Sequence, residues 1–331
     1  MDLSTEFIGI ELKNPLIASA SPMSAKLDSV KRLEDNGIGA VIMHSLFEER
    51  INHEVHELDH FLYANNDSYA EATDFFQDDL EFDNIEADDY LREIEDIKKS
   101  VDIPVIASLN GVSSGGWAKF AGKLQGAGAD GLELNITYIP TSLDMSGSEV
   151  EKMYLDTINT VKEHISIPLN IKMNSYFSNP ANMAKQFIDA GVQGLTLFDN
   201  PVQVDIDLDD LNSIHKANLT TSKDISESLR WCAILYNKLQ GSLCVGTGVH
   251  SAFDVFKAIM SGADSVALAS VLLQKGEGEI KNILEQMSIW MNEKEYHSIA
   301  QMKGSISLDH TRNPAAYERS SYMNALNSYR A

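Results

Sequence analysis

Eight short apolar runs, separated by longer amphipathic segments, constrain the fold of this chain more than any other feature. Each run has three to five residues, mostly Val, Ile and Leu, and is too short to form a helix. Runs of this largely apolar character are typical of strands that are buried on both faces of a parallel sheet. The runs are residues 16–20, 40–43, 105–109, 131–134, 169–171, 194–198, 243–245 and 265–269.

The segments between these runs have the pattern of helices. Residues 24–36 have apolar side chains at a spacing of three, and Gly37 follows as a stop signal. Residues 251–261 begin with Ser251, a suitable N-cap, and end before Gly262. Eight strand–helix units predict a closed α/β architecture, a (β/α)8 TIM barrel with long βα loops at its C-terminal face.

We expect one domain over residues 1–310 and a C-terminal extension over 311–331. Two acidic segments interrupt the regular alternation, 47–96 and 201–221. Each is interpreted either as a solvated surface segment, the first with one helix near 88–99, or as a lid over the barrel mouth.

The charge balance excludes some partners. The chain has 49 acidic and 26 basic residues, a formal net charge of −23, which disfavours nucleic acid and anionic membranes. No signal peptide and no apolar stretch of about 18 residues is present, so we expect a cytoplasmic protein. The two cysteines, Cys232 and Cys244, form no metal-binding motif, so we expect two buried thiols and no metal site.

Polar or small residues follow all eight expected strands. Active sites of (β/α)8 barrels lie at the C-terminal ends of the strands, so these positions are the candidate site. In chain order they are Ala20, Ser21, His44, Ser45, Asn110, Asn135, Lys172, Asp199, Asn200, Gly246, Thr247, Gly248, Ala269 and Ser270.

The turn Gly246-Thr247-Gly248 is the expected phosphate site, together with Ala269 and Ser270 after the last strand. Glycines allow backbone N–H groups to approach an anion, and the following helix adds the positive end of its dipole. Barrels commonly bind phosphate after their seventh and eighth strands.

Lys172 is the most informative charged residue of this set. It could stabilise the negative charge of a reduced flavin, act as a Schiff-base nucleophile as in barrel aldolases, or be a rim charge. His44 could bind an anion when it is protonated, or make a core hydrogen bond. Asn135 and Asn200 could orient a flavin or pyrimidine ring, or be ordinary loop residues.

The order of these motifs resembles the dihydroorotate dehydrogenases, especially the cytosolic class, over roughly residues 5–305. The first strand, Lys13-Asn14-Pro15-Leu16 with Ser19-Ala20-Ser21, is similar to the family's "NP…ASG" segment. The matches continue through Leu134-Asn135-Ile136-Thr137 ("NLS"), Ile171-Lys172 ("VK"), Gly246-Thr247-Gly248 ("GTGG") and His297-Ser298-Ile299-Ala300.

The resemblance implies an FMN-dependent oxidoreductase of pyrimidine biosynthesis that acts on a small substrate, uses a soluble electron acceptor and forms a homodimer. It implies that Asn200 contacts the substrate, with His44 and Asn135 beside it. FMN contacts are implied for Ala20, Ser21, His44, Asn135, Lys172, Gly246, Thr247, Gly248, Ala269 and Ser270.

The chain also departs from the family. His44 replaces a lysine, Tyr138 stands where the family has a cysteine base, and Val249 replaces the last glycine of "GTGG". The family's "NSMG" substrate loop is not recognisable in residues 64–68, and the glycine pair expected before the sixth helix reads Ser222-Lys223.

These departures leave the substrate open. Lys172 with Tyr138 or Ser142 is the predicted catalytic set, and Thr141 or Ser146 could replace Tyr138 as the base. One alternative function is a flavin-binding subunit without dehydrogenase turnover, serving as an electron relay or structural partner. Another is a Schiff-base aldolase that uses Lys172.

Overall fold

Eight parallel strands close into a barrel in the computed structural model, as the apolar runs predict. The structure describes residues 1–51, 87–112, 116–199, 203–208, 210–216, 218–312 and 314–318. The ring is closed by pairing of β13 with β3 and of β4 with β6. The barrel strands are β3 (Leu16–Ala18), β4 (Ala40–Ile42), β6 (Val105–Asn110), β7 (Gly131–Asn135), β8 (Leu169–Met173), β9 (Gly194–Leu197), β12 (Ser242–Val245) and β13 (Ser265–Leu268).

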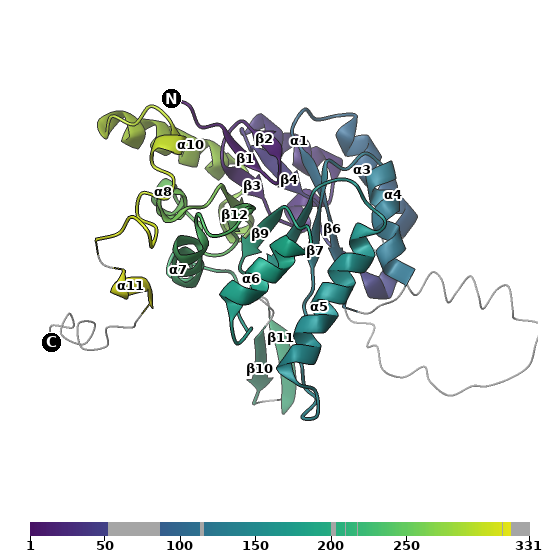
Figure 1. Cartoon of the computed structure of the whole chain (residues 1–331). Helices are drawn as coiled ribbons and strands as arrows, with labels where there is room; N and C mark the ends of the chain where they lie inside the picture. Colours follow the sequence, from purple (N-terminus) through teal and green to yellow (C-terminus); the bar gives the residue numbers. More distant parts are fainter. Residues whose placement is uncertain are drawn as a thin grey trace, which may run out of the picture.

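Helices alternate with these strands and surround the barrel (Figure 1). The expected N-cap at Ser251 is confirmed, because its side chain accepts a hydrogen bond from the N–H of Asp254. The helices are η1 (Pro22–Ser24), α1 (Leu27–Asp35), α3 (Ala87–Lys98), η2 (Gly116–Lys119), α4 (Phe120–Gly126), α5 (Gly147–Lys162), α6 (Pro180–Asp189), α7 (Ser226–Leu235), α8 (Ala252–Ser261), α9 (Ser270–Lys275), α10 (Gly278–Glu293), η3 (Ile299–Gln301) and α11 (Ala315–Glu318).

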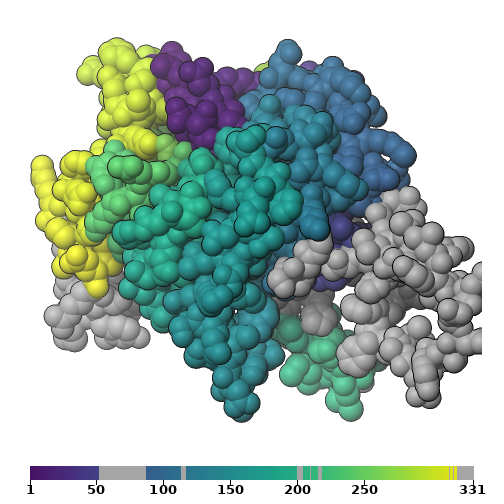
Figure 2. Space-filling view, turned by 45° about the vertical axis from the view of Figure 1, so that its right-hand side comes forward, coloured from purple at the N-terminus to yellow at the C-terminus, as the bar shows by residue number. Residues whose placement is uncertain are grey.

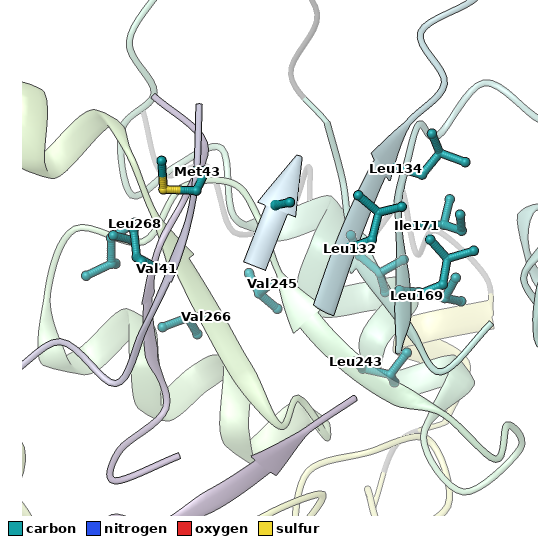
Figure 3. Close-up of a cluster of buried hydrophobic side chains, with 14 of the residues drawn as sticks. Val41, Met43, Leu132, Leu134, Leu169, Ile171, Leu243, Val245, Val266 and Leu268 are labelled. Atoms are coloured by element: carbon teal, nitrogen blue, oxygen red, sulfur yellow. The ribbon is translucent and has the colours of Figure 1, made fainter. Parts of the chain in front are cut away.

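Successive residues of each barrel strand point to opposite sides of the sheet. One set packs against the surrounding helices and forms the main core, and Figure 3 shows such side chains from β4, β7, β8, β12 and β13. The alternate set points into the barrel. It includes the apolar residues Ile17, Ile42 and Ile106 on β3, β4 and β6, and the polar residues Glu133 and Asn170 on β7 and β8.

An antiparallel hairpin, β1 (Thr5–Phe7) with β2 (Ile10–Leu12), covers the N-terminal end of the barrel. Its buried residues Phe7, Ile8 and Leu12 form one cluster with the interior residues at that end. Glycine provides the space for it: a Cβ on Gly194 would lie 2.5 Å from Cγ2 of Ile8. The hairpin therefore fills the barrel from its N-terminal end.

The open end has two projecting segments, the loop between β7 and α5 and a hairpin of β10 (Gln203–Asp207) with β11 (Asn212–Lys216). Figures 1 and 2 both show this hairpin at the end of the molecule opposite the N-terminal hairpin. The acidic segment 201–221, expected to be a surface segment or a lid, thus contains an antiparallel hairpin. A further short strand, β5 (Leu46–Phe47), extends the pairing with β6.

The structure also tests what the sequence predicted for the cysteines, for membrane-spanning helices and for the first acidic segment. Cys232 and Cys244 are free and buried, as predicted. In the part of the chain that the structure describes, no helix has the length and apolar character needed to span a membrane. The expected helix near 88–99 is α3, but most of the first acidic segment, residues 52–86, lies outside the described residues.

Candidate active site

The C-terminal ends of the strands enclose a cavity of about 260 Å³. A larger cavity of about 770 Å³ lies at the opposite end, beside Gly9 and Gly241, where barrels of this type carry no active site. The smaller cavity brings together eight of the predicted cofactor residues. They are Ala20, Ser21, Lys172, Gly246, Thr247, Gly248, Ala269 and Ser270.

The turn after β12 needs both of its glycines. A Cβ on Gly246 would lie 2.7 Å from Cγ2 of Thr196. Gly248 has φ +80°, and a Cβ there would lie 2.3 Å from the backbone nitrogen of Ile225, at the start of α7. Thr247 is fixed between them, because its hydroxyl donates to the carbonyl of Phe198 at 2.7 Å. The turn, which we call the cradle, is therefore packed so tightly against β9 and the start of α7 that neither glycine position has room for a side chain.

Thr220 is a residue of this cradle that sequence reasoning missed. Its N–H donates to Oγ of Ser270 at 3.0 Å, and its hydroxyl lies 3.2 Å from Nε2 of His250. No strong signal marked Thr220, because it lies in the long segment before α7, where the family pattern has glycines. The contact with Ser270 connects this segment directly to the expected phosphate site.

Asp254 holds the start of α8 and the same loop together. Its Oδ2 accepts from the hydroxyls of Ser222 at 2.7 Å and Ser251 at 2.9 Å. Burial alone would raise the pKa of Asp254, but hydrogen bonds from Ser222, Lys257 and Ser251 outweigh it and lower the pKa. Asp254 is therefore a stable anion that fixes the start of α8 beside the cradle. Its hydrogen bond with Ser222 anchors the segment before α7, in which Ser222-Lys223 replaces the family's glycine pair.

Lys172 lies near the C-terminal end of β8, and its Nζ is 3.2 Å from Oδ1 of Asp199. Both side chains are largely buried, at 15 % and 14 % exposure. Burial alone would lower the pKa of Lys172, but Asp199 and Glu133 together raise it. The amine is therefore held as an ammonium ion. A protonated amine cannot attack a carbonyl, which disfavours the aldolase hypothesis.

Glu133 lies inside the barrel and is 1 % exposed. Its Oε2 accepts from Nδ2 of Asn170 at 3.0 Å and lies 3.4 Å from Oγ1 of Thr196. Burial raises the pKa of Glu133, and the nearby charge of Lys172 opposes this rise only partly. The sequence contained a signal that was missed. Glu133 interrupts an apolar run and shares the face of Asn135, two residues further on.

Asn135 is buried and lies beside Lys172, because the two residues are partners in the β7–β8 register. Its Oδ1 accepts from the hydroxyl of Thr137 at 2.8 Å. The same hydroxyl lies 3.4 Å from Oδ2 of Asp199. The structure therefore places Asn135 next to the lysine, as the hypothesis of a shared ligand requires. Asn200 lies outside the described residues.

His44 follows β4 and packs edge-on against the ring of Tyr90, with ring centroids 4.8 Å apart. Burial and the nearby charge of Arg50 lower the pKa of His44 to about 4. The ring is therefore neutral near pH 7, which disfavours the alternative that a protonated His44 binds an anion. Nδ1 of His44 also has no hydrogen-bond partner among the described residues, so the other alternative, a core hydrogen bond, is not observed at this nitrogen.

Tyr138 and Ser142 lie in the loop between β7 and α5. Tyr138 is partly buried against the core, and its hydroxyl donates to Sδ of Met145 at 3.5 Å. Ser142 is exposed and accepts the N–H of Asp144 at 3.3 Å. Neither residue lines the cavity that contains Lys172 in the described structure. Their proposed catalytic role stays a prediction. Of the other two candidates in this loop, Thr141 is exposed, and Ser146 is the N-cap of α5.

A second cavity, of about 390 Å³, adjoins the first. Phe198, Asp199, Thr220 and Thr247 contribute to the walls of both cavities. The second cavity also has Tyr176 and several hydroxyl and carboxylate groups in its lining. No cluster of three His, Cys, Asp or Glu side chains suited to a metal ion occurs in the described parts of the chain. The described part of the site is therefore built from hydroxyls, amides, backbone groups, carboxylates and the ammonium ion of Lys172.

Comparison with known proteins identifies the family. The sequence model of the dihydroorotate dehydrogenase family matches residues 2–291. The chain is similar to proteins named "dihydroorotate dehydrogenase B (NAD(+)), catalytic subunit". It is 26 % identical to that of Thermoplasma acidophilum over 316 residues, which cover 92 % of this chain and 98 % of the relative. It is 25 % identical to that of Methanocaldococcus jannaschii over 302 residues, 88 % and 94 % of the two chains.

A bacterial relative is similar to the same extent. The protein of that name from Geotalea uraniireducens is 23 % identical over 316 residues, 92 % of this chain and 98 % of the relative. These matches span the whole barrel, including every strand whose end lines the cavity. The chain belongs to the dihydroorotate dehydrogenase family.

Proposed function

We propose that this chain is an FMN-dependent oxidoreductase of the dihydroorotate dehydrogenase type. It would oxidise or reduce a carbon–carbon bond next to a carbonyl, in dihydroorotate or a related small substrate. The observation that carries this proposal is one cavity lined by both the Gly246-Thr247-Gly248 cradle and the ammonium ion of Lys172. Family membership supports the same chemistry.

The residues of the cavity fit FMN. Gly246, Thr247 and Gly248 all line the cavity, so the backbone of this turn lies at the cavity wall, where its N–H groups could approach a phosphate. The hydroxyl of Ser21 is buried and has no hydrogen-bond partner among the described residues, so it is available to a ligand. Ser270 adds a hydroxyl beside the cradle, and Thr220 holds it in place by donating its N–H and its hydroxyl to Oγ of Ser270. We therefore assign the phosphate to these residues and the flavin ring to the side of Lys172 and Asn135.

The side chains would act on a bound ring by charge and hydrogen bonding. FMN would supply the hydride acceptor, a function that amino-acid side chains do not provide. Lys172 would stabilise negative charge at the atoms beside it, because its raised pKa keeps it protonated. The amide of Asn135 would orient the ligand beside Lys172, and Thr137 fixes the orientation of that amide.

The proton that leaves the substrate needs an acceptor. We assign this role to the loop between β7 and α5, with Tyr138 and Ser142 as the two candidates. A general base typically contributes about a hundredfold or more to such a step. Loss of about a hundredfold in a Tyr138→Phe or Ser142→Ala variant would identify the base. Wild-type rates in both would exclude Tyr138 and Ser142 and leave Thr141 and Ser146 as the candidates in this loop.

A flavin-binding subunit without dehydrogenase turnover is the second candidate function. It is favoured by one observation, that neither Tyr138 nor Ser142 lines the cavity containing Lys172 in the described structure. Such a subunit would keep the phosphate cradle and Lys172 but transfer electrons to or from a partner. The two functions differ in whether a small substrate reduces the flavin directly.

Our proposal also covers the setting of the reaction. We propose a cytoplasmic homodimer that passes electrons to a soluble acceptor, as the resemblance to the family implies. All three relatives described above are named as NAD(+)-type catalytic subunits. Light scattering of the purified protein would measure the oligomeric state.

The proposal predicts that the purified protein binds FMN and has the visible absorbance of a flavoprotein. Mixing it anaerobically with dihydroorotate, or with related dihydropyrimidines, should bleach that absorbance within the time of a stopped-flow experiment. Bleaching by any of these compounds excludes the function without turnover. A colourless protein that takes up no added FMN would overturn the proposal.

A further inference from the structure

The ion pair between Lys172 and Asp199 is not explained by cofactor binding alone. Asp199 follows β9, and its N–H donates to the carbonyl of Met173 at 2.8 Å, which fixes its backbone beside β8. Its carboxylate lies 3.2 Å from Nζ of Lys172, and both groups are largely buried. A charge pair in such surroundings is screened by water much less than a surface pair. Asp199 therefore acts strongly on the charge that faces the cavity.

The second oxygen of Asp199 has a separate contact. Oδ2 lies 3.4 Å from the hydroxyl of Thr137, which in turn donates to Oδ1 of Asn135. Asp199 therefore connects Lys172 with Asn135, the two residues assigned to the flavin ring. It also lines both cavities of the mouth, so it faces the space that ligands would occupy.

A second carboxyl group, that of Glu133, acts on the charge of the same lysine from inside the barrel. Glu133 is fully buried, and one of its oxygens has no hydrogen-bond partner among the described residues. Burial favours its protonated form and so limits its negative charge. Asp199, in contrast, is paired directly with the ammonium ion. Asp199 is therefore the group that offsets the positive charge of Lys172.

We infer that Asp199 is a positioning residue that holds Lys172 at the edge of the cofactor. By offsetting the charge of Lys172, Asp199 also weakens the binding of the reduced cofactor relative to the oxidised cofactor. The inference rests on the proposed binding of FMN. A free ammonium ion would stabilise the additional negative charge of reduced FMN. An adjacent carboxylate opposes that effect, so it lowers the reduction potential of the bound cofactor. The cofactor becomes a stronger electron donor.

The test compares Asp199→Asn with the wild-type protein, both loaded with FMN. Asparagine keeps the shape of the side chain and removes its charge. We expect the affinity for reduced FMN, relative to oxidised FMN, to increase about tenfold. For this two-electron couple a tenfold change corresponds to a rise of about 30 mV in midpoint potential. The potential is measured by anaerobic dye equilibration, and the dissociation constant of oxidised FMN by titration.

Two control variants separate charge from structure. Asp199→Glu retains the charge and should stay close to the wild-type potential. Asp189→Asn removes the same charge from an exposed pair with Lys185 at the other end of the barrel, and it should leave the potential unchanged. If Asp199→Asn does not fold, Asp199→Ser removes the same charge and should shift the potential in the same direction.

The outcomes distinguish this inference from the proposed function. An unchanged or lowered potential in a folded, FMN-binding Asp199→Asn protein would overturn the role of Asp199 and leave the oxidoreductase proposal intact. An equal rise in Asp199→Glu would also overturn it, because the charge is still present. If the wild-type protein takes up no FMN, the proposed function fails instead.

Discussion

The two halves of the barrel interior have opposite character. One half, which we call the lower interior, consists of Ile17, Ile42, Ile106 and other apolar residues packed on the β1–β2 hairpin. The other half, which we call the upper interior, consists of polar residues on β6, β7, β8 and β9. They are Ser108, Glu133, Asn170, Lys172 and Thr196.

This difference shows how a barrel can carry buried charge. Ionisable groups such as Glu133 and Lys172 cost free energy when they are removed from water, even when they are paired. The lower interior offsets this cost, because it buries apolar side chains almost completely. Stability and chemistry therefore reside in different parts of one barrel.

Replacement of Phe7 by alanine should have the largest effect of the predicted variants, a loss of stability in the lower interior. Phe7 is 1 % exposed and fills the lower interior, so Phe7→Ala should lower the free energy of unfolding by about 3–5 kcal/mol. The measurement is urea unfolding followed by circular dichroism. Phe253→Ala is the matched control, because Phe253 is 58 % exposed on α8 and should cost far less.

The same variant tests whether the two halves are independent. Below its unfolding transition, Phe7→Ala should bind FMN with a dissociation constant close to that of the wild type. A large loss of FMN affinity with retained stability would show that the two halves are not independent. The N-terminal hairpin would then also position the residues of the upper interior.

Gly248→Ala should have the next largest effect, and it acts on the upper half. The new Cβ would lie 2.3 Å from the backbone nitrogen of Ile225, so the cradle or α7 must move. We expect FMN affinity to fall about a hundredfold, or about 3 kcal/mol. Isothermal titration with FMN measures this loss.

Gly276 provides a matched control for this prediction. It has the same φ of +80° as Gly248, but a Cβ there would meet nothing within 4 Å. Gly276→Ala should therefore show only the backbone cost of a left-handed alanine, about 1–2 kcal/mol of stability, and normal FMN affinity. Equal FMN affinities in the two variants would contradict the assignment of the cradle to the phosphate.

The sequence was sufficient to predict the barrel because its strands are buried on both faces and stand out as apolar runs. The β1–β2 hairpin was not predictable in this way. Its turn has Ile8 at φ +50° and Gly9 at φ +80°, and turns of this type are usually recognised by Asn or Asp before glycine. Ile8 occupies the position because its side chain fills the barrel.

The site divides in the same manner. Lys172 and Gly246 could be predicted because each is chemically conspicuous at the end of an apolar run. Asp199 was visible as one of these polar strand ends, but its pairing with Lys172 was not. That pairing depends on the register of β8 against β9, and apolar runs do not specify register. Likewise, the low pKa of His44 depends on burial against Tyr90, a contact with a distant helix.

His44 supplies the smallest of the predicted effects, and it shows whether the upper half resists protonation. The pKa of His44 is about 4 in the folded chain, below its ordinary value of about 6.5. As pH falls from about 6.5 to 4, the unfolded chain gains a proton at this residue that the folded chain does not. The wild-type protein should therefore lose stability over this range, on the order of 2 kcal/mol. His44→Gln should lack this part of the loss. Urea unfolding of both proteins at pH 7.5 and 4.5 isolates it, because the lost contact with Tyr90 changes stability equally at both pH values. If the two proteins lose the same stability between these pH values, His44 takes up a proton as readily in the fold as outside it, and the upper interior is more accessible to water than its burial indicates.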